Sequence, residues 1–403
     1  MATLGLKNKM INSLKKTSSE YFTKQGYPSK KLENWKFTSS KNLKKFKKKK
    51  SSNAAHTNIE TDESTLLFIN GKLCLNTLKN FKYLDNIEIK ELVNIDNEMI
   101  LTFSNSFLDD SMFNLGISDF DGGHYIKFTK SINLLNPIKV VNLFENDASD
   151  ERISSFNIFH FSKGSQISII EEDKNEGDPS FNLKLNKYIC DDGSNINFAK
   201  LVEKEIECHL LSYSYFQLDK DVNLNIDSLN KDSIFNKEFI EIDLNNTGSN
   251  AKVNILNLGK DNQHLDNNIL INHKAEHCTS FQHVRNILDN KSTAVFNGKV
   301  VVAEGAQQTD SNQSNKNLLL SLDATAFSNP QLEIYADDVS CGHGSTTGAL
   351  DENSIFYLRA RGIDQSSAQK MLIKAFAKEV IDEFSLSSVQ DISEIALDNW
   401  ING

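Results

Sequence analysis

The 403-residue sequence lacks several features that would indicate common classes of protein. No run approaches the roughly 18 consecutive apolar residues that a membrane span needs, and residues 1–20 lack the apolar centre of a secretory signal. The five cysteines are odd in number and include no C-x-x-C pair, so they do not form a disulfide framework. These absences indicate a reducing compartment, and we expect a cytoplasmic location.

Motifs for catalysis and nucleotide binding are also scarce. No Ser/His/Asp or paired-carboxylate constellation is evident, and Gly342, Gly344 and Gly348 lack the spacing of a phosphate-binding loop. His273 and His277 do satisfy the H-x-x-E-H pattern of some zinc peptidases. That chemistry needs a helix, whereas the residues up to Ala275 alternate as in a strand, so a zinc hydrolase at His273/His277 is an alternative that the pattern disfavours.

Positive charge is concentrated at the start of the chain. Residues 1–50 hold 15 lysines against Glu20 and Glu33, and seven of these lysines lie in Lys41–Lys50. Blocks of like charge are usually solvated and unpaired, and the following segment is polar. We therefore interpret Lys41–Lys50 as a linker after an N-terminal helical region in which Trp35 is a packing anchor. No nucleic-acid partner is expected, because the block has no arginine for base contacts.

A long series of short apolar and polar alternations fills the middle of the chain. Ile240, Ile242 and Leu244 form one such row, and Ile269 and Ile271 form another. Turn-forming clusters separate the rows, most of which begin 13 to 18 residues apart. Regular strands without intervening helices predict a mainly β protein that is a sandwich, a barrel or a β-helix.

The sequence ends with three amphipathic segments that predict helices. Asp351, Asp364 and Ser388 are candidate N-caps for them. We expect these helices to cap the open end of a solenoid. The chain then divides into residues 1–100 (helical region with the Lys-rich linker), 101–348 (β core) and 349–403 (C-terminal helical domain).

A thiol and an imidazole lie two residues apart in Cys341-Gly342-His343-Gly344, just after a predicted strand. Both groups are ligands for iron and zinc. From residue chemistry alone, a tight turn with one buried cysteine is the favoured interpretation.

The surrounding residues resemble a known family. Residues 330–348 (PQLEIYADDVSCGHGSTTG), residues 355–363 (IFYLRARGI) and the N-terminal Glu33–Thr38 are similar to the SufD branch of the SufB/SufD family, which assembles iron–sulfur clusters in the SUF system. The SufB branch carries a Glu-His-Glu-Ala type segment where this chain has residues 341–344. The resemblance implies a right-handed parallel β-helix core flanked by helical regions.

The resemblance also implies a function. The chain would be a non-catalytic scaffold subunit that pairs with SufB, forms a homodimer in isolation, and binds the ATPase SufC. Iron or a transient iron–sulfur cluster would lie at the subunit interface, with His343 and Cys341 as candidate ligands. The family complex is also associated with reduced FAD, for which the sequence indicates no residue. The implied SufC docking residues are Phe356, Arg359, Arg361, Gly362 and Phe376. A passive β-helix interaction protein is the remaining alternative, and no membrane partner is expected.

Overall fold

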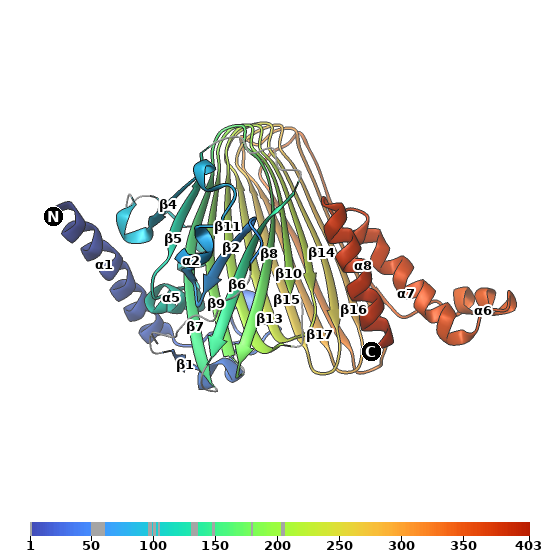
Figure 1. Ribbon diagram of the computed structural model, residues 1–403. Coiled ribbons are helices and arrows are strands. Elements are labelled where there is room, and N and C mark those ends of the chain that lie inside the picture. Colours follow the sequence, from blue (N-terminus) through green and yellow to red (C-terminus); the bar gives the residue numbers. More distant parts are fainter. Residues whose placement is uncertain are drawn as a thin grey trace.

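Two parallel β-sheets form the walls of a solenoid (Figure 1). The computed structural model describes residues 2–49, 61–95, 99, 102–103, 105–129, 136–146, 150–178, 180–202 and 206–403. From β5 onward the chain alternates between the sheets, and from β7 onward each strand pairs in parallel with the strand two places earlier. About seven turns result, which confirms the predicted parallel β-helix.

The first sheet contains β4 (Ile87–Glu91), β5 (His124–Phe128), β7 (Glu151–Phe161), β9 (Ser180–Cys190), β11 (Ile206–Leu218), β13 (Ser233–Leu244), β15 (His264–His273), β17 (Thr293–Val302) and β19 (Thr325–Ile334), and β1 (Lys47–Lys48) joins it through β7. The second sheet contains β3 (Lys72–Leu73), β2 (Thr65–Ile69), β6 (Ile138–Asn146), β8 (Gln166–Gly177), β10 (Asn195–Val202), β12 (Asn223–Asn230), β14 (Asn250–Gly259), β16 (Thr279–Leu288), β18 (Thr309–Leu319) and β20 (Val339–Gly348). Strands β2 and β4 belong to the two sheets although both precede residue 101.

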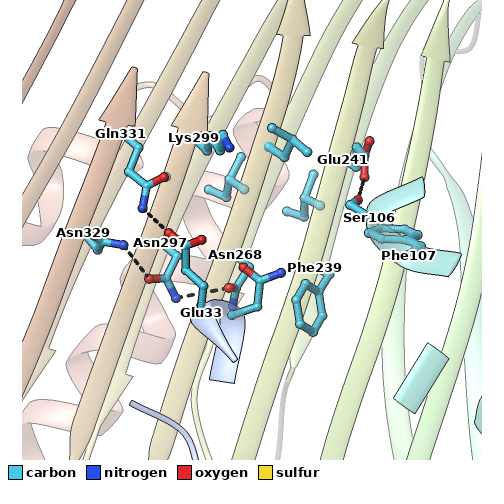
Figure 2. Close-up of a pocket in the computed structure, with 15 residues that line it drawn as sticks. Glu33, Ser106, Phe107, Phe239, Glu241, Asn268, Asn297, Lys299, Asn329 and Gln331 are labelled. Carbon is cyan, nitrogen blue, oxygen red and sulfur yellow. Dashed lines mark hydrogen bonds between the residues drawn. The ribbon is translucent and has the colours of Figure 1, made fainter. Parts of the chain in front are cut away.

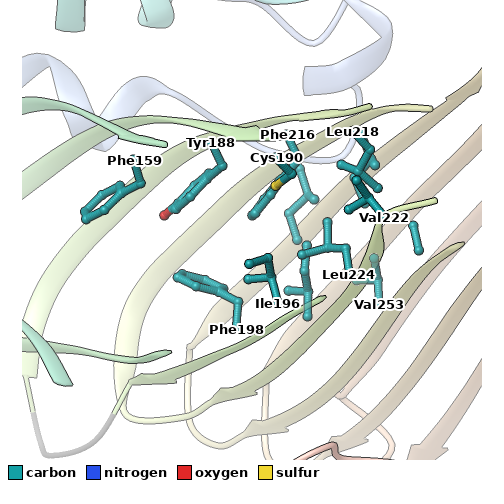
Figure 3. Close-up of a cluster of buried hydrophobic side chains, with 14 of the residues drawn as sticks. Phe159, Tyr188, Cys190, Ile196, Phe198, Phe216, Leu218, Val222, Leu224 and Val253 are labelled. Atoms are coloured by element: carbon teal, nitrogen blue, oxygen red, sulfur yellow. The ribbon is translucent and has the colours of Figure 1, made fainter. Parts of the chain in front are cut away.

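The space between the sheets is filled by apolar side chains that stack in columns (Figure 3). Phe159, Tyr188 and Phe216 occupy one column of the first sheet, with ring centroids 5.4 and 4.2 Å apart. Phe198 reaches the same stack from the second sheet. Each stacked aromatic pair adds about 0.5–1.5 kcal/mol beyond the burial of its surface.

Successive turns from the first sheet to the second carry one residue with positive φ. Six of these turns contain one such residue each. In chain order the residues are Gly164, Gly193, Asp221, Gly248, His277 and Gln308. A single left-handed residue reverses the chain compactly, which glycine does at least cost and Asp, Asn or His at moderate cost. The predicted turn clusters therefore mark where each strand passes to the other sheet.

Helices flank the solenoid at both ends of the sequence. The α-helices are α1 (Ala2–Gln25), α2 (Leu75–Leu78), α4 (Asn105–Leu108), α5 (Ser111–Asp119), α6 (Glu352–Ala360), α7 (Gln365–Ile381) and α8 (Ser387–Asn402). Short 3₁₀ turns are η1 (Glu33–Trp35), η2 (Lys41–Lys45), η3 (Leu84–Asn86) and η4 (Leu92–Asn94). In the described part of the chain, no helix combines the length and apolar character that crossing a membrane requires.

Over the residues that the structure describes, the lysine block has ordered backbone although most of its lysine side chains are exposed. Lys41–Lys45 is a 3₁₀ turn, and Lys47–Lys48 pairs in parallel with the start of β7. The prediction of a linker was wrong because the backbone of the block pairs with β7 and Phe46 is buried, while Lys45 Nζ lies 2.8 Å from Asp150 Oδ1 in an exposed ion pair. Lys50 and residues 51–60 lie outside the described residues.

The C-terminal helices cover a side of the solenoid and leave its end open (Figure 1). Helices α7 and α8 bury Ala377, Val380 and other apolar residues against the outer face of the second sheet. The capping prediction was wrong because the second sheet has an apolar outer face at this level, which attracts the apolar sides of the helices. Asp351 and Asp364 are N-caps as predicted, whereas α8 has Leu386 as its N-cap instead of Ser388.

The N-terminal segment is attached to the first sheet by a buried lysine. Lys237 on β13 donates to the Asn34 carbonyl oxygen at 2.8 Å and lies 2.5 Å from Asp266 Oδ2 on β15. Its Nζ also lies 4.9 Å from the ring centre of Trp35, which is 1% exposed and is the predicted packing anchor. A charge pair buried this fully stabilises the protein only while both partners are present.

We predict that Lys237→Met lowers the free energy of unfolding by about 3–5 kcal/mol, because Asp266 then remains buried without a counter-charge. The double variant Lys237→Met/Asp266→Asn should recover a large part of the loss. Denaturant unfolding followed by circular dichroism measures both. Lys163→Met is the control, because its ion pair with Asp192 is exposed and is worth at most about 1 kcal/mol. Equal losses in Lys237→Met and Lys163→Met would contradict the prediction.

Candidate functional site

Strands β19 and β20 are the last strands of the two sheets. Each pairs in parallel on one side only, β19 with β17 and β20 with β18. Every residue of β19 and β20 is at least partly exposed, in contrast to the buried strands before them. Within the described part of the chain, the solenoid therefore ends in two open edges with free backbone hydrogen-bonding groups.

Cys341 and His343 lie on β20 and project on the same side, because side chains two residues apart share a face of a strand. The same face of β18 is buried, with Ser311 in register with Cys341 and Gln313 in register with His343. The face of β20 that carries Cys341 and His343 is therefore the face that lines the interior of the solenoid. The structure brings the two predicted metal-binding residues together at the open end of that interior.

The side chains that line the interior change from apolar to polar toward the open end. The column that ends at Cys341 runs through Ile196, Leu224, Ala251, Ser280 and Ser311. The column that ends at His343 runs through Phe198, Ile226, Val253, Gln282 and Gln313. Both columns are apolar as far as β14 and polar from β16 onward. This polar end could be found in the sequence only after the strand register was known.

The two side chains differ in their surroundings. Cys341 is half-buried and packs against the central apolar cluster, and this burial raises the pKa of its thiol above the ordinary value. His343 is exposed. A thiol with a raised pKa stays protonated at neutral pH until a metal ion replaces the proton, whereas an accessible imidazole can bind metal through a ring nitrogen.

Two donors do not complete a metal site. Among the residues that the structure describes, no group of three or more His, Cys, Asp or Glu side chains is placed to hold a metal ion. Iron–sulfur clusters are usually held by four protein ligands. Cys341 and His343 can therefore supply at most part of a coordination sphere.

The H-x-x-E-H motif does not form a peptidase site, and the zinc-hydrolase alternative was wrong. His273 ends β15, is fully buried, and its Nε2 lies 2.8 Å from Ser280 Oγ. Burial lowers the pKa of His273 to about 4. His277 is the left-handed residue of the next turn, with φ of 58°, and is exposed. The helix that would place both rings on one metal is replaced by a strand and a turn because the solenoid must reverse there.

A cavity of about 180 Å³ lies on the outer face of the first sheet, beside the N-terminal segment (Figure 2). Asn268, Asn297 and Asn329 form a ladder of side-chain hydrogen bonds along its floor. Gln331 donates to Glu33 Oε1 at 2.6 Å at its edge. Because these polar groups bond one another, the arrangement ties the Glu33–Thr38 segment to β19. The sequence gives no sign of this cavity, since its residues come from six separate segments.

The predicted docking residues lie around α6 and α7. Phe356 is 74% exposed, and Arg359, Arg361 and Gly362 are exposed beside it. The Arg361 guanidinium lies 4.1 Å from the ring centre of Tyr357, which is 54% exposed. Phe376 differs, because it is half-buried and packs against the cluster beneath α7. Figure 1 shows α6 projecting away from the solenoid.

These features define a β-solenoid with a thiol and an imidazole at its open end and a helical extension on one side. Residues 144–376 match the family described as "SUF system FeS cluster assembly, SufBD core domain". The chain therefore belongs to the SufBD family of iron–sulfur cluster assembly proteins, which confirms the resemblance seen in the sequence.

Individual relatives agree with this assignment. The chain is 44% identical over 139 residues to the iron–sulfur cluster assembly protein SufD of Escherichia coli, which covers 34% of this chain and 33% of the relative. It is 43% identical over 122 residues to a SufBD family protein of Synechocystis, covering 30% and 26%. Identity to SufD of Bacillus subtilis is 20% over 278 residues, covering 67% and 62%. The chain thus matches about a third or less of the length of the first two relatives.

We predict that iodoacetamide modifies Cys341 more slowly at pH 7.5 than it modifies an unstructured cysteine peptide. The raised pKa leaves less thiolate at this pH, and the rate should increase about tenfold per pH unit until the pKa is reached. Peptide mass spectrometry of the time course measures the rate at each cysteine. Cys190 and Cys208 are the controls, because both are buried and should remain unmodified in the folded chain. A Cys341 rate that does not change between pH 7 and pH 9 would contradict the prediction.

Proposed function

We propose that this chain is a scaffold subunit for iron–sulfur cluster assembly and not an enzyme in its own right. It pairs with a SufB-type subunit through the open end of the solenoid and binds a SufC-type ATPase through its C-terminal helices. The observation that carries the proposal is the position of Cys341 and His343 on an unpaired edge strand, beside the opening of a polar interior. Iron, sulfide or a nascent cluster is the cargo at this end.

The open edges support pairing with another subunit. Exposed sheet edges are sites for strand addition or edge-to-edge contact, and natural proteins usually cover them. Here Ile334, the last residue of β19, is 39% exposed, and the next residue, Tyr335, is 63% exposed. A partner solenoid with its own open edges would cover these residues. The same surface would let two copies of this chain pair when the partner is absent.

Pairing would also complete the donor set. Cys341 and His343 are two donors, so a cluster or iron ion held at this end needs further ligands from the partner. His343 would bind through a neutral ring nitrogen, and Cys341 would lose its proton as the metal binds. An interface that opens and closes would then control access to the cargo.

The energy for such a movement would come from the ATPase partner, because the sequence contains no phosphate-binding loop. The exposed aromatic residues Phe356 and Tyr357, with Arg359 and Arg361 beside them, are of the types enriched in protein interfaces. We place the ATPase on this surface. Phe376 would then support the helix from beneath. Reduced FAD belongs to the proposed assembly without an assigned residue, and we place the assembly in the cytoplasm.

We predict that His343→Ala lowers the iron and sulfide bound to the purified complex by at least about tenfold, because one of few ligands is lost. The chain is co-expressed with its cognate SufB and SufC, purified without oxygen, and assayed for both elements. His277→Ala is the matched control, since it removes an exposed histidine from a turn of the same solenoid.

The outcomes separate the alternatives. If all three complexes form and only His343→Ala loses iron and sulfide, the cargo site is supported. If the complexes form and His343→Ala keeps its iron, His343 does not bind the cargo and the chain acts as a passive interaction protein. If the wild-type chain forms no complex with either subunit, the scaffold proposal fails.

We predict that Phe356→Ala weakens binding of the ATPase subunit by about 2 kcal/mol, or roughly 30-fold in Kd, because buried aromatic anchors carry much of the energy of an interface. Isothermal titration of the purified chain with SufC measures the change. Phe281→Ala is the control, since it truncates an exposed phenylalanine on β16 outside the helices. Equal affinities in wild type and Phe356→Ala would place the ATPase elsewhere.

A further inference from the structure

Two glutamine side chains lie inside the solenoid directly behind His343. Gln282 on β16 and Gln313 on β18 are 1% and 0% exposed. They occupy the same inward-facing column, and Gln313 is in register with His343. Strands paired in register lie about 4.8 Å apart, so the Gln313 amide is within reach of the imidazole.

Neither amide has a hydrogen-bond partner among the described residues. The side-chain oxygen and nitrogen of both glutamines are buried and unpaired. Most buried polar groups in proteins are paired, and an unpaired one destabilises the fold unless another role retains it. Four unpaired atoms in one column, at the end of the solenoid that carries the proposed cargo site, indicate such a role.

The two glutamines differ in what surrounds them. Gln282 lies against β17: a Cβ added to Gly298 would lie 2.7 Å from Gln282 Oε1, so the glycine leaves space for this amide. Gln313 instead has His343 as its next neighbour toward the open end. Only one of the two amides can therefore contact the imidazole directly.

A histidine that binds metal through one ring nitrogen usually donates its other N–H to an oxygen, which fixes the tautomer and the direction of the ring. His343 is exposed and lies on an edge strand, so nothing on its solvent side provides that oxygen within the described chain. We infer that Gln313 is a positioning residue for His343. Its amide oxygen, which has no partner in the structure, would accept a hydrogen bond from one ring N–H after a rotation of the side chain and leave the other nitrogen directed at the cargo.

This inference rests on the proposed function, and it adds a residue that neither touches the cargo nor contributes charge. Gln313 acts through His343 by selecting one imidazole tautomer. Gln282 continues the polar column one strand deeper and has no direct contact with the ring. The pair therefore offers a matched comparison of the same residue type, burial and column.

The experiment compares Gln313→Met with Gln282→Met. Methionine keeps nearly the same shape without hydrogen-bonding groups, so both variants should fold with a melting temperature equal to or above that of wild type. In the chain labelled with ¹⁵N-histidine, the His343 ring signals are assigned by their loss in His343→Ala. We expect one dominant tautomer in wild type and in Gln282→Met, and a mixture of tautomers in Gln313→Met.

The second measurement is Fe²⁺ binding by the anaerobic complex with SufB and SufC. Loss of an outer-shell partner typically lowers metal affinity about tenfold to a hundredfold. We expect this decrease in Gln313→Met and not in Gln282→Met. Gln313→Asn, which withdraws the amide by one methylene group, provides the same readouts if Gln313→Met does not fold.

Two results would overturn the inference. One is a His343 tautomer in Gln313→Met that matches wild type, and the other is an equal change in Gln282→Met, which would indicate general packing of the interior. Failure of the proposed function is distinguishable. In that case His343→Ala keeps its iron, while the ring signals still report whether Gln313 contacts His343.

Discussion

The structure depends on in-register parallel pairing between each strand from β7 onward and the strand two places earlier. Because paired residues project on the same side, inward positions continue as columns from one turn of the solenoid to the next. A column of apolar residues becomes a continuous core, as the stacked Phe159, Tyr188 and Phe216 demonstrate. A column that changes to polar residues creates a polar region at a defined level. Core and candidate site are therefore two parts of one repeating arrangement.

The same pairing leaves the last turn without a partner. Interior strands are bonded on both sides, whereas β19 and β20 are bonded on one. Residues that would be buried in any earlier turn become accessible there, which is why Cys341 is half-buried and His343 exposed although both lie on the inward face. The residues of the open end can therefore serve both as metal-binding donors and as a surface for association with another subunit. The C-terminal helices preserve this end because they pack on the side of the second sheet.

Buried charges hold the flanking segments in place. Lys237 and Asp266 attach the N-terminal motif to the first sheet, and Arg285 on β16 lies 3.1 Å from Glu379 on α7. Asp227 accepts the backbone N–H of Ser385 at 2.7 Å just before α8. Such contacts are directional and need both partners, so they select one position for each segment. Apolar packing alone would hold these segments less specifically.

The sequence alone determined the strand alternation, the helix N-caps at Asp351 and Asp364, the anchor Trp35 and the family, because these depend on local periodicity or on contiguous motifs. It also predicted the pair Cys341 and His343 as candidate donors. The predictions for the lysine block and for the position of the C-terminal helices were wrong, since each depends on groups distant in the chain. Only the tertiary structure decided that Gln313 lies behind His343 at the open end. Thirty residues separate the two in sequence, and strand register alone brings them together.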